Sequence, residues 1–126
     1  MALWQGKSRR KPSGGRLIFS KGKRRFEIGT EKQFTKISTQ SLKKYRVFGG
    51  GIKVRMLSAE FANVLDKKTN KVVKTKILGV KTNPADPNYV QRSIVNKGAT
   101  IKTELGDAII TSRPGQDGAV NAVLLE

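Results

Sequence analysis

The chain has 126 residues, with 26 Lys or Arg against nine Asp or Glu, a formal net charge of +17, and neither Cys nor His. This composition excludes disulfides, thiolate chemistry, Cys or His metal sites and a histidine proton shuttle. The length fits one domain, and the large positive charge indicates a polyanionic partner. Because the chain has no apolar run of about 18 residues and turns polar directly after Trp4, we expect a soluble intracellular protein without a signal peptide.

The positive charge is concentrated in the N-terminal part of the chain. Residues 1–56 carry 16 basic and two acidic residues, a net charge of +14, whereas residues 57–126 carry ten basic and seven acidic residues, a net charge of +3. Low hydrophobicity and frequent turn formers predict that the first 40 residues are disordered when free. We therefore assign residues 1–44 to an extended basic arm and residues 45–126 to a β-rich domain.

The first elements expected after the arm are a hairpin and a long strand. Tyr45–Leu57 has apolar and basic residues on both sides of three glycines, a pattern typical of a β-hairpin. The polar segment Asp66–Lys71 predicts a turn. Val72–Thr82 is rich in β-branched residues and partly alternates between apolar and polar positions, which predicts a strand.

Shorter elements are expected in the C-terminal third. Pro87 predicts the start of a short helix near residues 87–92. Two short strands follow, separated near Lys97 and Gly98, and two more are joined by a loop over Ser112–Gly118. Several short strands at this spacing predict a mainly β fold with a small antiparallel, barrel-like domain.

The arm combines cations with aromatic residues, as expected of an RNA-binding segment. Cations neutralise phosphates and release counterions, Arg forms bidentate phosphate contacts, and planar side chains stack on unpaired bases. A membrane-binding segment is disfavoured because no amphipathic helical face accompanies the charge. The predicted RNA-binding residues of the arm, the hairpin and the Ser112–Gly118 loop are Trp4, Lys7, Arg9, Arg10, Lys11, Arg16, Lys21, Lys23, Arg24, Arg25, Arg46, Lys53, Arg55 and Arg113.

Several of these residues have a second interpretation. Trp4 either contacts RNA or packs under its own β-domain, and the Arg113 loop is either an RNA contact or a plain hairpin loop. Phe61 and Tyr89 are expected in the core. The lysines between residues 67 and 76 are expected to be solvated strand and turn residues.

Five segments together resemble a known family: "WQGKSRRKPSGG", "GKRRFEIG", "RVFGGGIKVRMLSAEFANV", "NPADPNYVQR" and "IVNKGATIKTELGDAIITSRPGQDGAVNAVLLE". This succession resembles the S8e family of small-subunit ribosomal proteins, in its archaeal form without the long eukaryotic insertion. The resemblance runs from Trp4 to Glu126. It departs from the family pattern at Phe48 and at Gly51, where an Arg and an Asn are usual.

The resemblance implies a structural component of the small ribosomal subunit, located in the cytoplasm, with an arm threaded into ribosomal RNA. It implies neighbouring ribosomal proteins as further partners, and neither catalysis nor a cofactor. We also expect no bound metal, no membrane contact and no small-molecule substrate. The scattered acidic residues also disfavour an enzyme, and "RVFGGGIK" lacks the spacing of a phosphate-binding loop. The alternatives are an assembly factor that binds pre-ribosomal RNA and a DNA-packaging protein.

Overall fold

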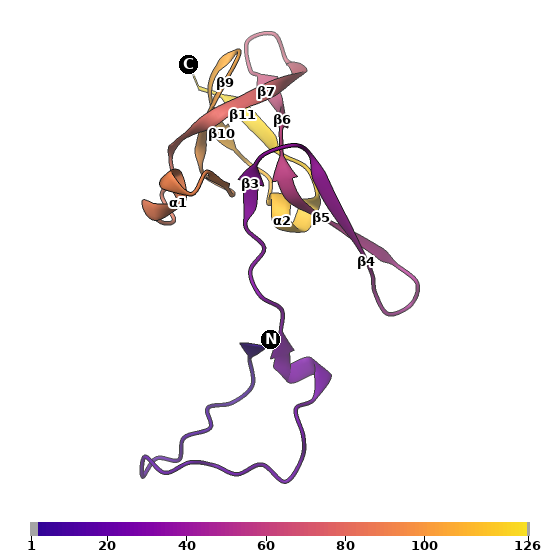
Figure 1. The fold of residues 1–126 in the computed structure, drawn as a ribbon, viewed down its shortest axis with the longest axis vertical. Coiled ribbons are helices and arrows are strands. Elements are labelled where there is room, and N and C mark those ends of the chain that lie inside the picture. Colours follow the sequence, from indigo (N-terminus) through magenta and orange to yellow (C-terminus); the bar gives the residue numbers. More distant parts are fainter. Residues whose placement is uncertain (1–2, 126) are drawn as a thin grey trace. The chain divides into compact units, whose positions relative to one another are not determined.

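The computed structural model describes residues 3–125, and the chain divides into two compact units, Met1–Lys32 and Gln33–Glu126 (Figure 1). In the first unit, strand β1 (Leu3–Trp4) pairs antiparallel with strand β2 (Ile28–Gly29), which follows the short 3₁₀ helix η1 (Arg25–Glu27). The backbone N–H of Gln5 also donates to the carbonyl of Glu27 at 2.8 Å. These contacts close the intervening segment into a loop.

The second unit contains a closed five-stranded barrel. Its neighbouring strands are, in order, β10 (Gly106–Ile110), β11 (Asn121–Leu124), β6 (Phe61–Asp66), β7 (Lys71–Thr82) and β9 (Thr100–Thr103). All neighbours are antiparallel except β11 and β6, which pair in parallel. The predicted mainly β fold with a small barrel-like domain is confirmed.

The barrel core follows from period-two alternation along these strands. Small side chains occupy many inward positions, as a narrow five-stranded barrel requires: Ala62, Ala108 and Ala122 are each at most 2% exposed. Larger residues fill the remaining space. They are Val64, Ile77, Ile101 and Ile110.

A four-stranded sheet continues from the barrel, with strand order β4 (Ser41–Arg46), β5 (Ile52–Ala59), β3 (Thr35–Ile37) and β8 (Ile94–Val95). Met56, Ala59 and Val95 from this sheet belong to the same hydrophobic cluster as the barrel residues. The boundary expected between residues 44 and 45 falls inside β4. The assignment of RNA binding to an arm over residues 1–44, separate from a β-rich domain over residues 45–126, stays a prediction.

Two short helices interrupt the strands. Helix α1 (Asn88–Gln91) lies within residues 87–92, where the sequence predicts a helix. Helix α2 (Pro114–Asp117) lies in the connection between β10 and β11, where the sequence predicts only a loop. Pro114 at its first turn favours the helical φ angle, and Gly118 ends it at a φ of 72°.

The expectation that Phe61 and Tyr89 lie in the core is wrong. Both are half-buried and lie outside the core cluster. The ring of Tyr89 lies 5.3 Å from that of Phe34, and the Lys74 ammonium lies 4.7 Å from the ring of Phe61. These ring positions place Tyr89 against another ring and Phe61 against a cation, both outside the core. Among residues 3–125, no helix is long and apolar enough to cross a membrane.

Candidate nucleic-acid interface

The arm loop, residues 5–27, contains a small hairpin at its basic end. The backbone N–H of Leu17 donates to the carbonyl of Arg9 at 2.8 Å, and Lys11 and Gly15 close the turn with another 2.8 Å bond. One guanidinium nitrogen of Arg10 donates to the carbonyl of Gly14 at 2.8 Å. Arg10 therefore stabilises the turn with one donor while its other N–H groups stay available for phosphate.

An aromatic and cationic cluster lies at the base of the arm loop. The Arg9 guanidinium lies 4.5 Å from the ring centroid of Trp4 and 5.7 Å from that of Phe19, and the two rings are 5.6 Å apart. The indole N–H of Trp4 donates to the carbonyl of Lys7 at 2.8 Å. A Cβ atom on Gly6 would lie 2.5 Å from the Trp4 ring, so only glycine permits this close approach. Trp4 is thus held by residues of its own unit.

The predicted arm cations are all solvent-exposed, although Arg9 is also engaged with the rings. Nine of them fall within 19 residues and are joined by a closed backbone loop. Such density creates a strong positive potential that attracts a polyanion and slows its departure. The exposed arm cations are Lys7, Arg9, Arg10, Lys11, Arg16, Lys21, Lys23, Arg24 and Arg25.

The β4–β5 hairpin provides a second basic surface. Lys43 pairs with Arg55 and Tyr45 pairs with Lys53, so these four side chains share one face. The Tyr45 ring lies 5.0 Å from the Arg55 guanidinium carbon and 5.3 Å from the Lys43 ammonium. We call this set, Lys43, Tyr45, Lys53 and Arg55, the hairpin basic face.

Arg46 lies on the opposite face of the hairpin, where it pairs with Ile52. Further along that face, Val54 contacts the end of α2 near Gly118. Lys53 and Arg55 are among the residues predicted from the sequence to bind RNA, whereas Lys43 and Tyr45 are not. The available signal was the alternation of residues on each side of the glycines, which puts all four on one face once the register is known.

Arg113 is exposed at the start of α2, in a loop that is firmly anchored. Its backbone N–H donates to the Asp117 carboxylate at 2.8 Å. The buried Ser112 hydroxyl donates to the carbonyl of Ala119 at 2.8 Å and accepts from the N–H of Asn121 at 2.9 Å. Because α2 packs against β5, Arg113 extends from an element next to the hairpin (Figure 1).

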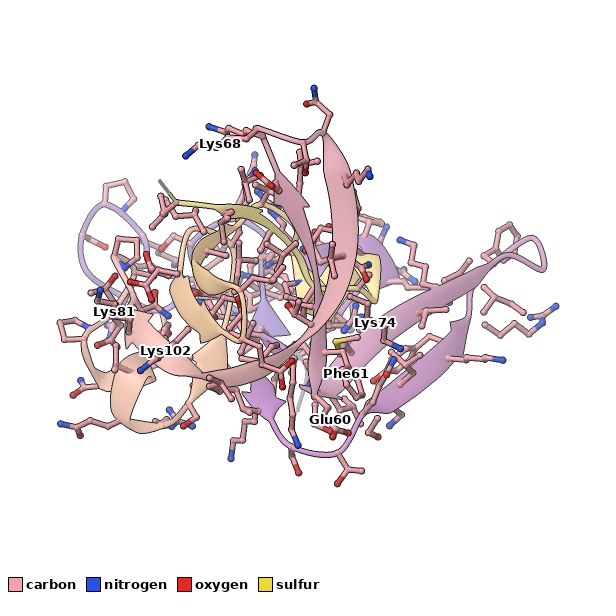
Figure 2. The ribbon with its side chains drawn as sticks, turned by 90° about the horizontal axis from the view of Figure 1, so that it is seen from above. Glu60, Phe61, Lys68, Lys74, Lys81 and Lys102 are labelled. Atoms are coloured by element: carbon pink, nitrogen blue, oxygen red, sulfur yellow. The ribbon has the colours of Figure 1, made fainter. Side chains whose placement is uncertain are left out.

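Two lysines of β7 form ion pairs, and Figure 2 labels one member of each pair, Glu60 and Lys81. Lys76 forms an ion pair with Glu60 at 3.7 Å, and Lys81 donates to Asp107 at 2.6 Å. Lys68 lies at the β6–β7 turn. Partly exposed ion pairs of this kind contribute little to stability and reduce the local positive potential. Lys76 and Lys81 are therefore less available to phosphate than those arm cations that form no ion pair within residues 3–125.

Acidic residues form no metal-binding arrangement within the part of the chain that the structure describes. No group of three or more Asp or Glu side chains there could hold a metal ion. Asp66 instead stabilises the β6–β7 turn. The backbone N–H of Lys68 and the hydroxyl of Thr69 donate to its carboxylate, and these bonds lower the pKa of Asp66.

Comparison with known proteins gives a consistent result over the whole chain. The sequence profile of the family described as ribosomal protein S8e matches residues 4–125. A relative from Methanocorpusculum labreanum, named small ribosomal subunit protein eS8, is 60% identical over 124 residues, which cover 98% of this chain and 99% of the relative. The protein of that name from Picrophilus torridus is 52% identical over 125 residues, covering 99% and 100%. The one from Methanoculleus marisnigri is 55% identical over 122 residues, covering 97% and 98%.

Proposed function

The chain belongs to the ribosomal protein S8e family, and from this premise we propose that it is a structural component of the small ribosomal subunit that binds and stabilises ribosomal RNA. The family is a structural class, and we infer that the protein acts in the ribosome by binding, without catalysis or cofactor. Neighbouring ribosomal proteins are its expected further partners. The observation that carries the RNA-binding proposal is the series of nine exposed cations along a closed loop.

The arm loop would bind RNA mainly through phosphate contacts. Each contact that replaces a condensed counterion contributes to affinity and to its dependence on salt. Loop closure by the β1–β2 pair reduces the number of conformations that RNA binding must select. The contacts also offset the mutual repulsion of cations on a chain with a net charge of +17.

The hairpin basic face adds a second, more rigid contact surface. Its cations lie on paired strands, so their spacing is set by the sheet rather than by flexible loop backbone. Tyr45 holds Lys43 and Arg55 at its ring, which limits the rotamers these long side chains must lose on binding. We include Lys43 and Tyr45 with Lys53 and Arg55 in the proposed interface.

The direct test is the salt dependence of binding of the full chain to small-subunit ribosomal RNA. Lys7→Gln with Lys11→Gln removes two exposed charges without removing a ring contact, unlike a change at Arg9. If both lysines contact phosphate, the log–log salt slope becomes less steep by about two units. The matched control, Lys67→Gln with Lys68→Gln, removes two exposed charges at the β6–β7 turn and leaves the slope unchanged. A slope for the arm variant that equals the wild-type slope would refute the arm contacts.

The alternative assembly-factor role makes a different prediction about the particle that holds the protein. A structural component remains with mature small subunits during sedimentation in high salt. An assembly factor is found only on precursor particles. The full-length similarity to proteins named as components of the small subunit favours the structural role.

A further inference from the structure

The arm loop and Trp4 line a solvent-open cavity that contains both aromatic and cationic side chains. Its volume is about 770 Å³, within the range of about 300–1,000 Å³ that holds small ligands in proteins. The cavity lies wholly within the first unit of the chain. It is therefore large enough for a nucleotide and is formed by residues whose relative positions the structure describes.

One part of the lining is a fixed aromatic wall. Trp4, Arg9 and Phe19 all line the cavity and contact each other at 4.5–5.7 Å between group centres. The Trp4 indole is oriented by its hydrogen bond to the Lys7 carbonyl. A wall that is assembled before the ligand arrives loses little side-chain freedom on binding.

Phe26 has a solvent-exposed ring in the same cavity. It lies in η1, lines the cavity and is 84% exposed, although it is one of the larger apolar side chains of the arm. Exposed apolar groups that gather beside a cavity mark a contact surface. An aromatic ring in this setting has a free face on which a planar group can stack.

Charge identifies the ligand that suits this ring. Lys21, Lys23 and Arg24 line the cavity beside Phe26. Among the described lining residues, Glu27 is the only acidic one, and its carboxylate accepts a hydrogen bond from the backbone N–H of Arg24 at 3.2 Å. The lining thus complements a ligand that has both a planar ring and negative charge.

We propose that this cavity receives an unpaired nucleotide of RNA, with its base stacked on Phe26 and its phosphates contacted by Lys21 and Lys23. This inference rests on the proposed RNA-binding function and specifies what one site of the arm recognises. A base inside a duplex has both faces covered by its neighbours, whereas a bulged or looped-out base has a face to offer. The cavity therefore selects unpaired RNA, while the remaining arm cations contact phosphates of any RNA.

The test compares two RNA probes with the intact chain. One probe is a short RNA duplex, and the other is the same duplex with one central unpaired nucleotide, a fluorescent adenine analogue that is quenched on stacking. We expect the wild-type chain to bind the bulged RNA about tenfold more tightly than the duplex, and to quench the analogue. Phe26→Ala should abolish both effects, while its salt slope stays unchanged because no charge is removed.

Two control variants separate stacking from loss of structure. Phe26→Tyr keeps an aromatic ring and should retain the preference and the quenching. Phe48→Ala removes a phenylalanine that is 90% exposed, but at the tip of the β4–β5 hairpin, and should also retain both. Because Phe26 is mostly exposed, its replacement leaves the described hydrogen bonds of the loop intact.

The outcomes distinguish the inference from the proposed function. Equal affinity of the wild-type chain for both probes, or an unchanged preference in Phe26→Ala, overturns the nucleotide site while steep salt dependence leaves RNA binding in place. If neither these probes nor ribosomal RNA binds with a steep salt slope, the RNA-binding function fails, and the nucleotide site fails with it.

Discussion

Replacing Thr75 by Val should stabilise the β-domain. Thr75 lies in β7, pairs with Ala62 and is 5% exposed, and its buried hydroxyl has no hydrogen-bond partner among the residues that the structure describes. Burying an unpaired hydroxyl costs about 1–3 kcal/mol. Valine has nearly the same shape and the same preference for strands. We therefore expect the free energy of unfolding to rise by about 1–2 kcal/mol.

Thr103 provides a control in which the same substitution has the opposite effect. It lies in β9, next to β7, and is 3% exposed. Its hydroxyl donates to the carbonyl of Gly106 at 2.7 Å. Thr103→Val removes this donor and leaves the carbonyl with one partner fewer, so the free energy of unfolding should fall by about 1 kcal/mol.

Urea denaturation of the full chain, followed by far-ultraviolet circular dichroism, measures both effects. Equal m-values for wild type and variants would show that the folded and unfolded ensembles are comparable. In thermal unfolding, each kcal/mol corresponds to a shift of about 4–8 °C for a domain of this size. If Thr75→Val lowers stability as much as Thr103→Val, the Thr75 hydroxyl makes a favourable interaction and our reasoning is wrong.

Two further predictions concern turns of the β-domain. Gly118→Ala should lower the free energy of unfolding by about 1–2 kcal/mol because of its φ of 72° alone, and by more because the new Cβ would lie 3.1 Å from Val54 Cγ1. Gly50 has a φ of 83° and no neighbouring atom within 4 Å of an added Cβ, so Gly50→Ala measures the backbone cost alone. Equal losses of unfolding free energy in the two variants would contradict the Val54 contact. The hydrogen bond from the backbone N–H of Lys68 lowers the pKa of Asp66 most, followed by the bond from the Thr69 hydroxyl. The Asp66 carboxylate should therefore stabilise the turn above pH 3.8, and this stabilisation should be lost as the pH falls through the folded pKa. Carboxyl-carbon NMR titration would contradict this if Asp66 titrated at or above 3.8.

Much of the fold was predictable because its signals are local. The glycines after Phe48 predict the hairpin turn, the polar residues after Asp66 predict the next turn, and β-branched residues predict the strand that follows. The nine arm cations and the nearby rings were also visible directly, since charge density and aromatic content need no tertiary information. The prediction of a polyanionic partner depends only on these features.

The missed features depend on contacts between distant residues. The parallel pairing of β11 with β6 places Asn121 opposite Asn63, and no local sequence pattern predicts a pairing between residues so far apart in the chain. Phenylalanine is common in protein cores, but Phe61 is partly exposed in the structure, with its ring 4.7 Å from the Lys74 ammonium. Helix α2 is a single turn, too short to produce helical periodicity.

In the candidate interface, too, some features follow from the local sequence and others depend on contacts between distant residues. By itself, the sequence determined which residues carry positive charge and where turns interrupt them, and it predicted an anionic partner, because these properties belong to individual side chains and their neighbours. Only the tertiary structure decided that Trp4 contacts Arg9 and Phe19, and that Tyr45 shares a face with Arg55. Those contacts depend on chain closure and strand register, which are set by the packing of residues far apart in sequence.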